Sequence, residues 1–172
     1  IFVQDIAVNP HIINGSDRQQ IVSALAEGLR RNNKFTGINY GDLNGNVIRA
    51  QGDTAYLGDR EYYQKAIQTK KMTISDPLIS RGSGKISLAI AVPVIAHGNV
   101  IAVIQATMPL DSLNDMVNGI KFMDNGYGFI VDKSGVIIAH AQNPELKGLN
   151  LTQKKTDPVV VIMVPIIQNT LQ

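Results

Sequence analysis

An arginine and two tyrosines stand together in Arg60-Glu61-Tyr62-Tyr63, the segment of the sequence best suited to bind a small anion. A guanidinium offers a fixed fork of N–H donors to a carboxylate or a phosphate. The rings of Tyr62 and Tyr63 would add flat apolar faces with a hydroxyl at the rim of a pocket. An alternative stays open for each residue, because Arg60 could be solvated at a helix start and the tyrosines could belong to the core.

The sequence lacks the patterns of a catalytic or metal site. Neither a Gly-x-Ser-x-Gly elbow nor a His-Glu-x-x-His pair is present, and there is no cysteine. Gly82-Ser83-Gly84-Lys85 ends like a phosphate loop but lacks the earlier glycine and joins strands. His11, His97 and His140 are far apart and lack metal-ligand spacing. We therefore predict no catalytic residue, no metal and no cofactor.

Composition indicates an ordinary folded protein. The 172 residues are 44% hydrophobic and 17% charged, which is enough chain for one large domain or two small ones. The formal net charge is +2, and a basic pair such as Lys154-Lys155 is too small for a nucleic-acid surface. We expect no nucleic-acid partner.

Helical signals occur near the start of the chain. Ser16-Asp17-Arg18-Gln19 has the spacing of a capping box with Ser16 as the N-cap. Ile21, Val22, Leu25 and Leu29 then follow with helical period, until Asn32-Asn33 ends the run. Residues 2–13 contain Pro10 and indicate the broken end of another helix.

Two further helices are predicted from possible caps. Asp59 is placed to cap a helix that runs from Arg60 to about Thr69. Asp111 or Ser112 could cap a second, short helix.

Strand signals fill most of the remaining chain. Residues 35–50 predict a hairpin, residues 73 and 78–80 short extended segments, and residues 86–96 and 100–108 two long apolar strands. A further hairpin is predicted at residues 127–140 and another strand at residues 159–164. The turn Asp42-x-x-Gly45 recurs 90 residues later as Asp132-x-x-Gly135, which indicates an internal repeat. Coincidence is the alternative, because Asp-x-x-Gly turns are common.

This succession of motifs, from about Ser16 to Leu151, resembles the double Cache domains. Those domains are extracytoplasmic sensors of bacterial chemoreceptors, histidine kinases and diguanylate cyclases. The motifs that carry the resemblance are Asp59-Arg60-Glu61-Tyr62-Tyr63, Ser75-Asp76-Pro77, Gly84-Lys85, Ala91-Val92-Pro93-Val94 and Pro109-Leu110-Asp111-Ser112-Leu113.

The resemblance implies an α+β fold with two tandem PAS-like antiparallel sheets beside a long N-terminal helix. Residues 1–34 would form the helical segment, residues 35–122 a membrane-distal subdomain with a five-stranded sheet, and residues 123–172 a small or incomplete proximal subdomain.

The resemblance also implies a ligand in the distal pocket. Arg60, Tyr62 and Tyr63 would contribute, with Tyr62 at a position that holds tryptophan in amino-acid sensors. Thr107 stands where such sensors place an acidic residue, and Leu78 and Ser80 stand where they place tyrosine and aspartate. An ammonium without a charged partner costs several kcal/mol to desolvate. We therefore expect a small organic acid held by Arg60, not an α-amino acid.

These implications predict the periplasmic or extracellular sensor domain of a membrane receptor, most simply a methyl-accepting chemotaxis protein. A histidine kinase, a diguanylate cyclase or a module that senses through a protein partner are the alternatives. We expect a homodimer formed through the N-terminal helix. The longest apolar runs, residues 88–96 and 158–167, are shorter than the roughly 20 residues of a membrane-spanning helix. The chain starts at Ile1 without a leader-like segment, so we expect a fragment whose membrane anchors lie outside it.

Overall fold

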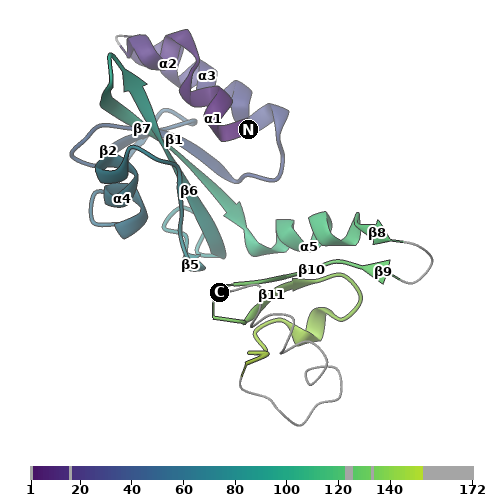
Figure 1. Ribbon diagram of the computed structural model, residues 1–172. Helices are drawn as coiled ribbons and strands as arrows, with labels where there is room; N and C mark the ends of the chain where they lie inside the picture. The colour runs from purple at the N-terminus through teal and green to yellow at the C-terminus, as the bar shows by residue number, and fades with distance from the viewer. Residues whose placement is uncertain (1, 16, 123–125, 133, 153–172) are drawn as a thin grey trace. The chain divides into compact units, whose positions relative to one another are not determined.

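A computed structural model describes residues 2–15, 17–122, 126–132 and 134–152 (Figure 1). The chain forms two compact units, Ile1–Pro109 and Leu110–Gln172. The predicted N-cap Ser16 and the predicted strand at residues 159–164 lie outside the described residues. Within the described ranges, no helix combines the length and the apolar character needed to cross a bilayer.

Three helices form the start of the chain, namely α1 (Phe2–Ala7), α2 (Pro10–Asn14) and α3 (Arg18–Arg31). The helix predicted after the capping box and the break predicted near Pro10 are confirmed, whereas the described residues do not contain the long N-terminal helix that the resemblance implies. Proline at the first position of α2 cannot extend α1, and Gly15 at φ 59° ends α2 in the left-handed conformation. Asp17 is the N-cap of α3, one residue after the predicted cap, and its carboxylate accepts the Gln19 backbone N–H at 2.8 Å.

Seven antiparallel strands form the main sheet of the first unit, instead of the five expected. Their order is β3-β2-β1-β7-β6-β4, with β5 also paired to β6. The strands are β1 (Gly37–Gly41), β2 (Asn46–Arg49), β3 (Thr54–Tyr56), β4 (Thr73–Ile74), β5 (Leu78–Ile79), β6 (Ile86–Ala96) and β7 (Asn99–Pro109). The two long apolar strands and the first hairpin are confirmed, whereas β3 was not predicted.

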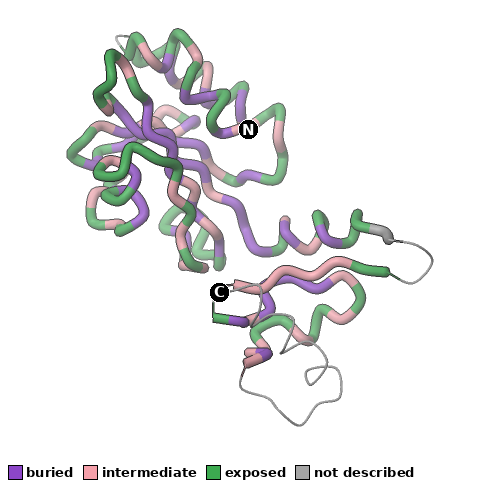
Figure 2. Tube along the Cα trace, in the orientation of Figure 1, coloured by how far each residue is buried: buried purple, intermediate pink, exposed green. Residues whose placement is uncertain are grey.

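Helices cover both faces of this sheet (Figures 1 and 2). Helices α1 and α3 contact its central strands on one side, and α4 (Glu61–Thr69) contacts β6 and β7 on the other. The core under α4 includes Tyr63, Ala66, Ala91 and Val103. Because side chains alternate along a strand, Asn39, Gln105 and Thr107 share this α4 face with Ala89 and Ala91.

The second unit begins with α5 (Leu110–Asn118). It continues with β8 (Lys121–Phe122), β9 (Gly126–Tyr127), β10 (Phe129–Val131), β11 (Ile137–His140) and a 3-10 turn (Pro144–Leu146). The predicted hairpin is confirmed, since β10 pairs antiparallel with β11. Asp111 and Ser112 lie inside the first turn of α5, so the prediction that either caps it is wrong. Helix α5 packs on β11, and so the structure groups this helix with the second unit. The described residues thus show one main sheet and two small two-stranded sheets, not two sheets of equal size.

The predicted recurrence of the Asp-x-x-Gly turn is confirmed in its hydrogen bonds. In both turns the Asp carboxylate accepts the backbone N–H groups two and four residues later. These donors are Asn44 and Asn46 for Asp42 (both 2.9 Å), and Ser134 and Val136 for Asp132 (2.8 and 3.0 Å). The glycine N–H bonds the Asp carbonyl in each turn, at 3.1 and 3.0 Å.

Candidate functional site

A cavity of about 420 Å³ lies on the α4 face of the main sheet, within the first unit. Volumes of this order are typical of pockets for small molecules. Five of the six residues that the sequence nominated line it, namely Arg60, Tyr62, Leu78, Ser80 and Thr107. The fold thus brings three separate stretches of chain to one cavity, while ligand binding by these residues stays a prediction.

Tyr63 is the nominated residue that the structure places elsewhere. Its ring is fully buried in the core between α4 and the sheet, and it does not line the cavity. The hydroxyl donates to the Asp42 carbonyl at 2.9 Å. Burial raises the pKa of this phenol, and the nearby Asp42 charge raises it further. Tyr63 therefore has a structural role in fixing the first turn to α4.

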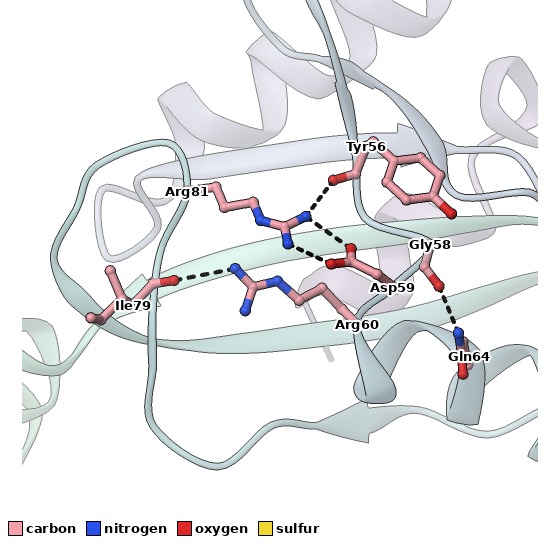
Figure 3. Close-up of polar contacts among 7 residues, drawn as sticks. All are labelled: Tyr56, Gly58, Asp59, Arg60, Gln64, Ile79 and Arg81. Atoms are coloured by element: carbon pink, nitrogen blue, oxygen red, sulfur yellow. Dashed lines mark hydrogen bonds and ion pairs between the residues drawn. The ribbon is translucent and has the colours of Figure 1, made fainter.

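Arg60 enters the cavity from the residue that precedes α4. Its backbone, at φ −84° and ψ 125°, makes it the N-cap residue, but no side chain caps this helix end. One Nη donates to the Ile79 carbonyl at 3.5 Å, which is long for a hydrogen bond (Figure 3). The Nε atom is buried and has no hydrogen-bond partner among the described residues. Arg60 therefore lines the cavity and keeps one buried donor, Nε, for which the described structure gives no hydrogen-bond partner.

Asp59 does not cap α4, and that prediction is wrong because Arg81 takes its carboxylate. Both Asp59 oxygens accept from the Arg81 guanidinium, at 2.8 and 2.5 Å, and Arg81 also donates to the Tyr56 carbonyl at 3.0 Å (Figure 3). These hydrogen bonds from Arg81 lower the pKa of Asp59. The sequence analysis did not identify Arg81 as a site residue, yet the structure places it on the cavity wall.

Neutral polar side chains form the floor of the cavity. Asn39 donates to the Gln105 side-chain carbonyl at 2.5 Å, and the Gln105 amide donates to the Thr107 hydroxyl oxygen at 3.1 Å. Because that oxygen accepts a bond, the Thr107 hydroxyl hydrogen remains a donor for the cavity. Gln105 was missed, although a glutamine inside an otherwise apolar strand is itself a signal of a buried polar site.

The arginines around the cavity differ in how they are paired. Arg49 forms an ion pair with Asp53 at 2.8 Å, and Arg81 is paired with Asp59. Asp53 lines the cavity together with all three arginines, Arg49, Arg60 and Arg81. Among the described residues, Arg60 is the cavity arginine for which the structure gives no carboxylate partner.

The Tyr62 side chain contacts both the core and the cavity. It is 7% exposed and packs in the α4 cluster while it lines the cavity. Burial raises the pKa of Tyr62 to about 12, partly offset by the charges of Arg60 and Arg81. The phenol is therefore neutral and can both donate and accept at physiological pH.

The chain matches a known protein family and is similar to several known proteins. A family model described as a Cache domain, dCache_1, matches residues 2–170. Methyl-accepting chemotaxis protein PscA of Pseudomonas syringae pv. tomato is 32% identical over 92 residues, which are 53% of this chain and 15% of that protein. Sporulation kinase D of Bacillus subtilis is 29% identical over 106 residues, which are 59% of this chain and 21% of that protein. The chain thus spans less than a quarter of either relative.

A solved structure with a similar fold is the ligand-binding domain of the Pseudomonas fluorescens chemoreceptor CtaA in complex with L-valine. The two share 22% identity with a TM-score of 0.69, over 88% of this chain and 68% of the other. At that identity the likeness is one of fold.

Proposed function

Because the chain belongs to the Cache domain family, we propose that it is the extracytoplasmic ligand-binding domain of a bacterial transmembrane receptor. We propose further that a methyl-accepting chemotaxis receptor is the parent protein, as the relative PscA suggests. A sensor kinase is the second candidate, because sporulation kinase D matches a similar share of the chain.

One observation carries the binding function, namely the buried Arg60 Nε without a partner in the described structure. A buried donor left unsatisfied costs about 1–3 kcal/mol, more when it carries charge. Once the Arg60 side chain turns toward the cavity that it lines, a ligand carboxylate would accept from Nε and one Nη and so satisfy the donor through the planar fork. The hydrogen bonds between Arg60 and the ligand carboxylate are then the main source of binding affinity.

The charges around the cavity support a small organic acid as the ligand. Arg49 and Arg81 are already neutralised by aspartates, so a single carboxylate on Arg60 completes the pairing. Asn39, Gln105 and Thr107 offer neutral donors and acceptors, which suit a hydroxyl or carbonyl group on the ligand.

An α-amino acid is the competing ligand, since CtaA was solved with L-valine bound. Thr107, Leu78 and Ser80 carry no charge that could pair with an ammonium. The cavity carboxylate, Asp53, bonds Arg49 at 2.8 Å, and its side chain is 52% exposed. An ammonium near Thr107 would therefore be poorly compensated.

A module that senses through a protein partner is less well supported. An apolar, filled cavity would favour it, whereas this cavity is open and lined by arginines and amides. Binding would act by differential affinity for two receptor states, and we propose a homodimer formed through the N-terminal helices as the transmitting assembly.

Isothermal titration with propionate, L-lactate and L-alanine tests the ligand class, because these three differ only at the α-substituent. We expect L-lactate to bind most tightly and L-alanine at least about tenfold more weakly, since its ammonium lacks a partner. Tightest binding by L-alanine would replace the organic acid with an amino acid. No binding by these compounds or by a wider panel of acids and amino acids would contradict direct sensing.

A further inference from the structure

Asp59 and Arg60 are adjacent and oppositely charged, yet they do not form an ion pair. The Asp59 carboxylate gives both oxygens to Arg81, while the Arg60 Nε is left without a partner among the described residues (Figure 3). The Arg81 fork therefore occupies both oxygens of the carboxylate that precedes Arg60 in the chain.

We propose that Arg81 is a positioning residue that sequesters the Asp59 carboxylate and so keeps Arg60 available to an anionic ligand. The inference rests on the proposed function in one respect, that the ligand is an anion held by Arg60. It adds a residue that governs affinity through a neighbour instead of through a ligand contact.

Three contacts fix Arg81 in this role. Two parallel N–H···O bonds join its fork to Asp59, and the third bond reaches the Tyr56 carbonyl at 3.0 Å. A fork-to-fork pair is directional, so it sets the orientation of the carboxylate as well as its distance. The turn that carries Arg81 is itself closed by the Gly84 N–H on the Ser80 carbonyl at 2.8 Å.

Arg60 directly follows Asp59 in the chain, so it is the cation next to this carboxylate along the backbone (Figure 3). Hydrogen bonds from Arg81 lower the pKa of Asp59 most, and the charge of Arg60 lowers it further. Without Arg81, the Asp59 carboxylate can form an ion pair with the neighbouring Arg60. That ion pair would use the Arg60 N–H donors that otherwise bind the ligand.

This role predicts an order of affinities that other roles do not. If Arg81 only sequesters Asp59, then Arg81→Gln weakens anion binding, Asp59→Asn does not, and the double variant binds like the wild type. If Arg81 contacts the ligand, the double variant is as weak as Arg81→Gln. If the Asp59–Arg81 ion pair only stabilises the turn that carries Arg81, Arg81→Gln and Asp59→Asn weaken binding to the same extent.

The experiment combines calorimetry with L-lactate and the arginine Nε–Hε NMR signals of the ligand-free protein. Arg60→Lys assigns the Arg60 signal. In Arg81→Gln we expect the Arg60 Hε to exchange more slowly with water, and L-lactate to bind at least about tenfold more weakly, as for loss of charge-assisted bonds. Asp59→Asn/Arg81→Gln should restore both values. Arg81→Lys, which keeps the charge without the fork, should give an intermediate result and replaces Arg81→Gln if that variant does not fold.

An unchanged Arg60 signal in the variant that lacks the Arg81 fork, or a double variant that stays weak, would overturn the inference. The NMR result needs no ligand. Failure of L-lactate to bind the wild type would therefore count against the proposed function and leave the sequestration of Asp59 to be decided by the Arg60 signal.

Discussion

The Tyr63 hydroxyl occupies the space that a side chain on Gly41 would need. A Cβ on Gly41 would overlap the Tyr63 oxygen and approach Val47 to 2.7 Å. The glycine lets β1 and α4 approach closely, and the hydroxyl then reaches the Asp42 carbonyl at 2.9 Å. This contact joins α4 to the turn that follows β1.

Gly41→Ala should therefore destabilise the first unit by about 1–3 kcal/mol, the usual cost of overpacking. Urea denaturation would measure the loss. Gly37→Ala is the matched control on the same strand, because its added Cβ would stand 3.9 Å from Thr107 Oγ1, an ordinary contact. Equal losses for the two variants would show that close packing at Gly41 is not the cause.

Tyr63→Phe should separate stability from binding. Loss of the hydroxyl's hydrogen bond should lower the free energy of unfolding by about 0.5–1.5 kcal/mol. Affinity for L-lactate, measured by calorimetry, should stay within about twofold because the residue is away from the cavity. A large loss of affinity with unchanged stability would show that Tyr63 contributes to ligand binding.

Much of this fold could be predicted from the sequence. Residues 86–96 and 100–108 are long apolar runs around a His-Gly turn, and a central hairpin is the structure that buries them on both faces. The two Asp-x-x-Gly turns fix their own geometry through local hydrogen bonds. The resemblance to double Cache domains, read from short motifs, is confirmed by the family match.

The errors at Asp59 and Gln105 share a physical cause, which is interaction with residues distant in the sequence. Asp59 has the sequence context of a helix cap, but Arg81 lies 22 positions away and takes its carboxylate. The role of Gln105 depends on strand register, which sets it opposite Asn39. The spacing of residues in the sequence does not identify Arg81 as the partner of Asp59 or Asn39 as the partner of Gln105. The break in the N-terminal helices depends on Pro10, a local signal, and the sequence predicted it.

Thr107→Asp should change the ligand preference of the cavity. It would add a carboxylate at the position where related amino-acid sensors are expected to hold one, beside Gln105. We expect binding of L-alanine to strengthen by about tenfold or more and that of L-lactate to weaken, through attraction and repulsion at the α-substituent. Calorimetry with both ligands would measure the switch.

Thr107→Asn is the control for that substitution, since it has a similar size without the charge. It should leave L-alanine binding weak. A gain in L-alanine affinity in both variants would mean that shape, not charge, decides the preference.

His140 should make the second unit less stable in mild acid. Burial lowers the pKa of His140, although Glu145 opposes this, and Nδ1 accepts the Asn143 N–H at 3.0 Å. The folded state therefore favours the neutral ring, so stability is full above the ordinary pKa near 6.5 and is lost as the pH falls below it.

Thermal unfolding between about pH 5 and 8 would measure this dependence. His140→Asn should flatten the pH profile while it lowers stability overall, because the contacts with Tyr127 and Phe129 are lost. His97→Asn, at an exposed turn position, is the control and should leave the profile unchanged. A profile that depends on His97 instead would contradict the assignment.

The most direct test of the central claim is the affinity for L-lactate of Arg60→Gln beside that of Arg31→Gln. Both changes remove one positive charge, but Arg31 is an exposed residue of α3 and does not line the cavity. Calorimetry should give at least about tenfold weaker binding for Arg60→Gln, as for loss of a charge-assisted pair, and wild-type binding for Arg31→Gln. Wild-type affinity in Arg60→Gln, or equal losses in both, would contradict the claim that this guanidinium holds the ligand.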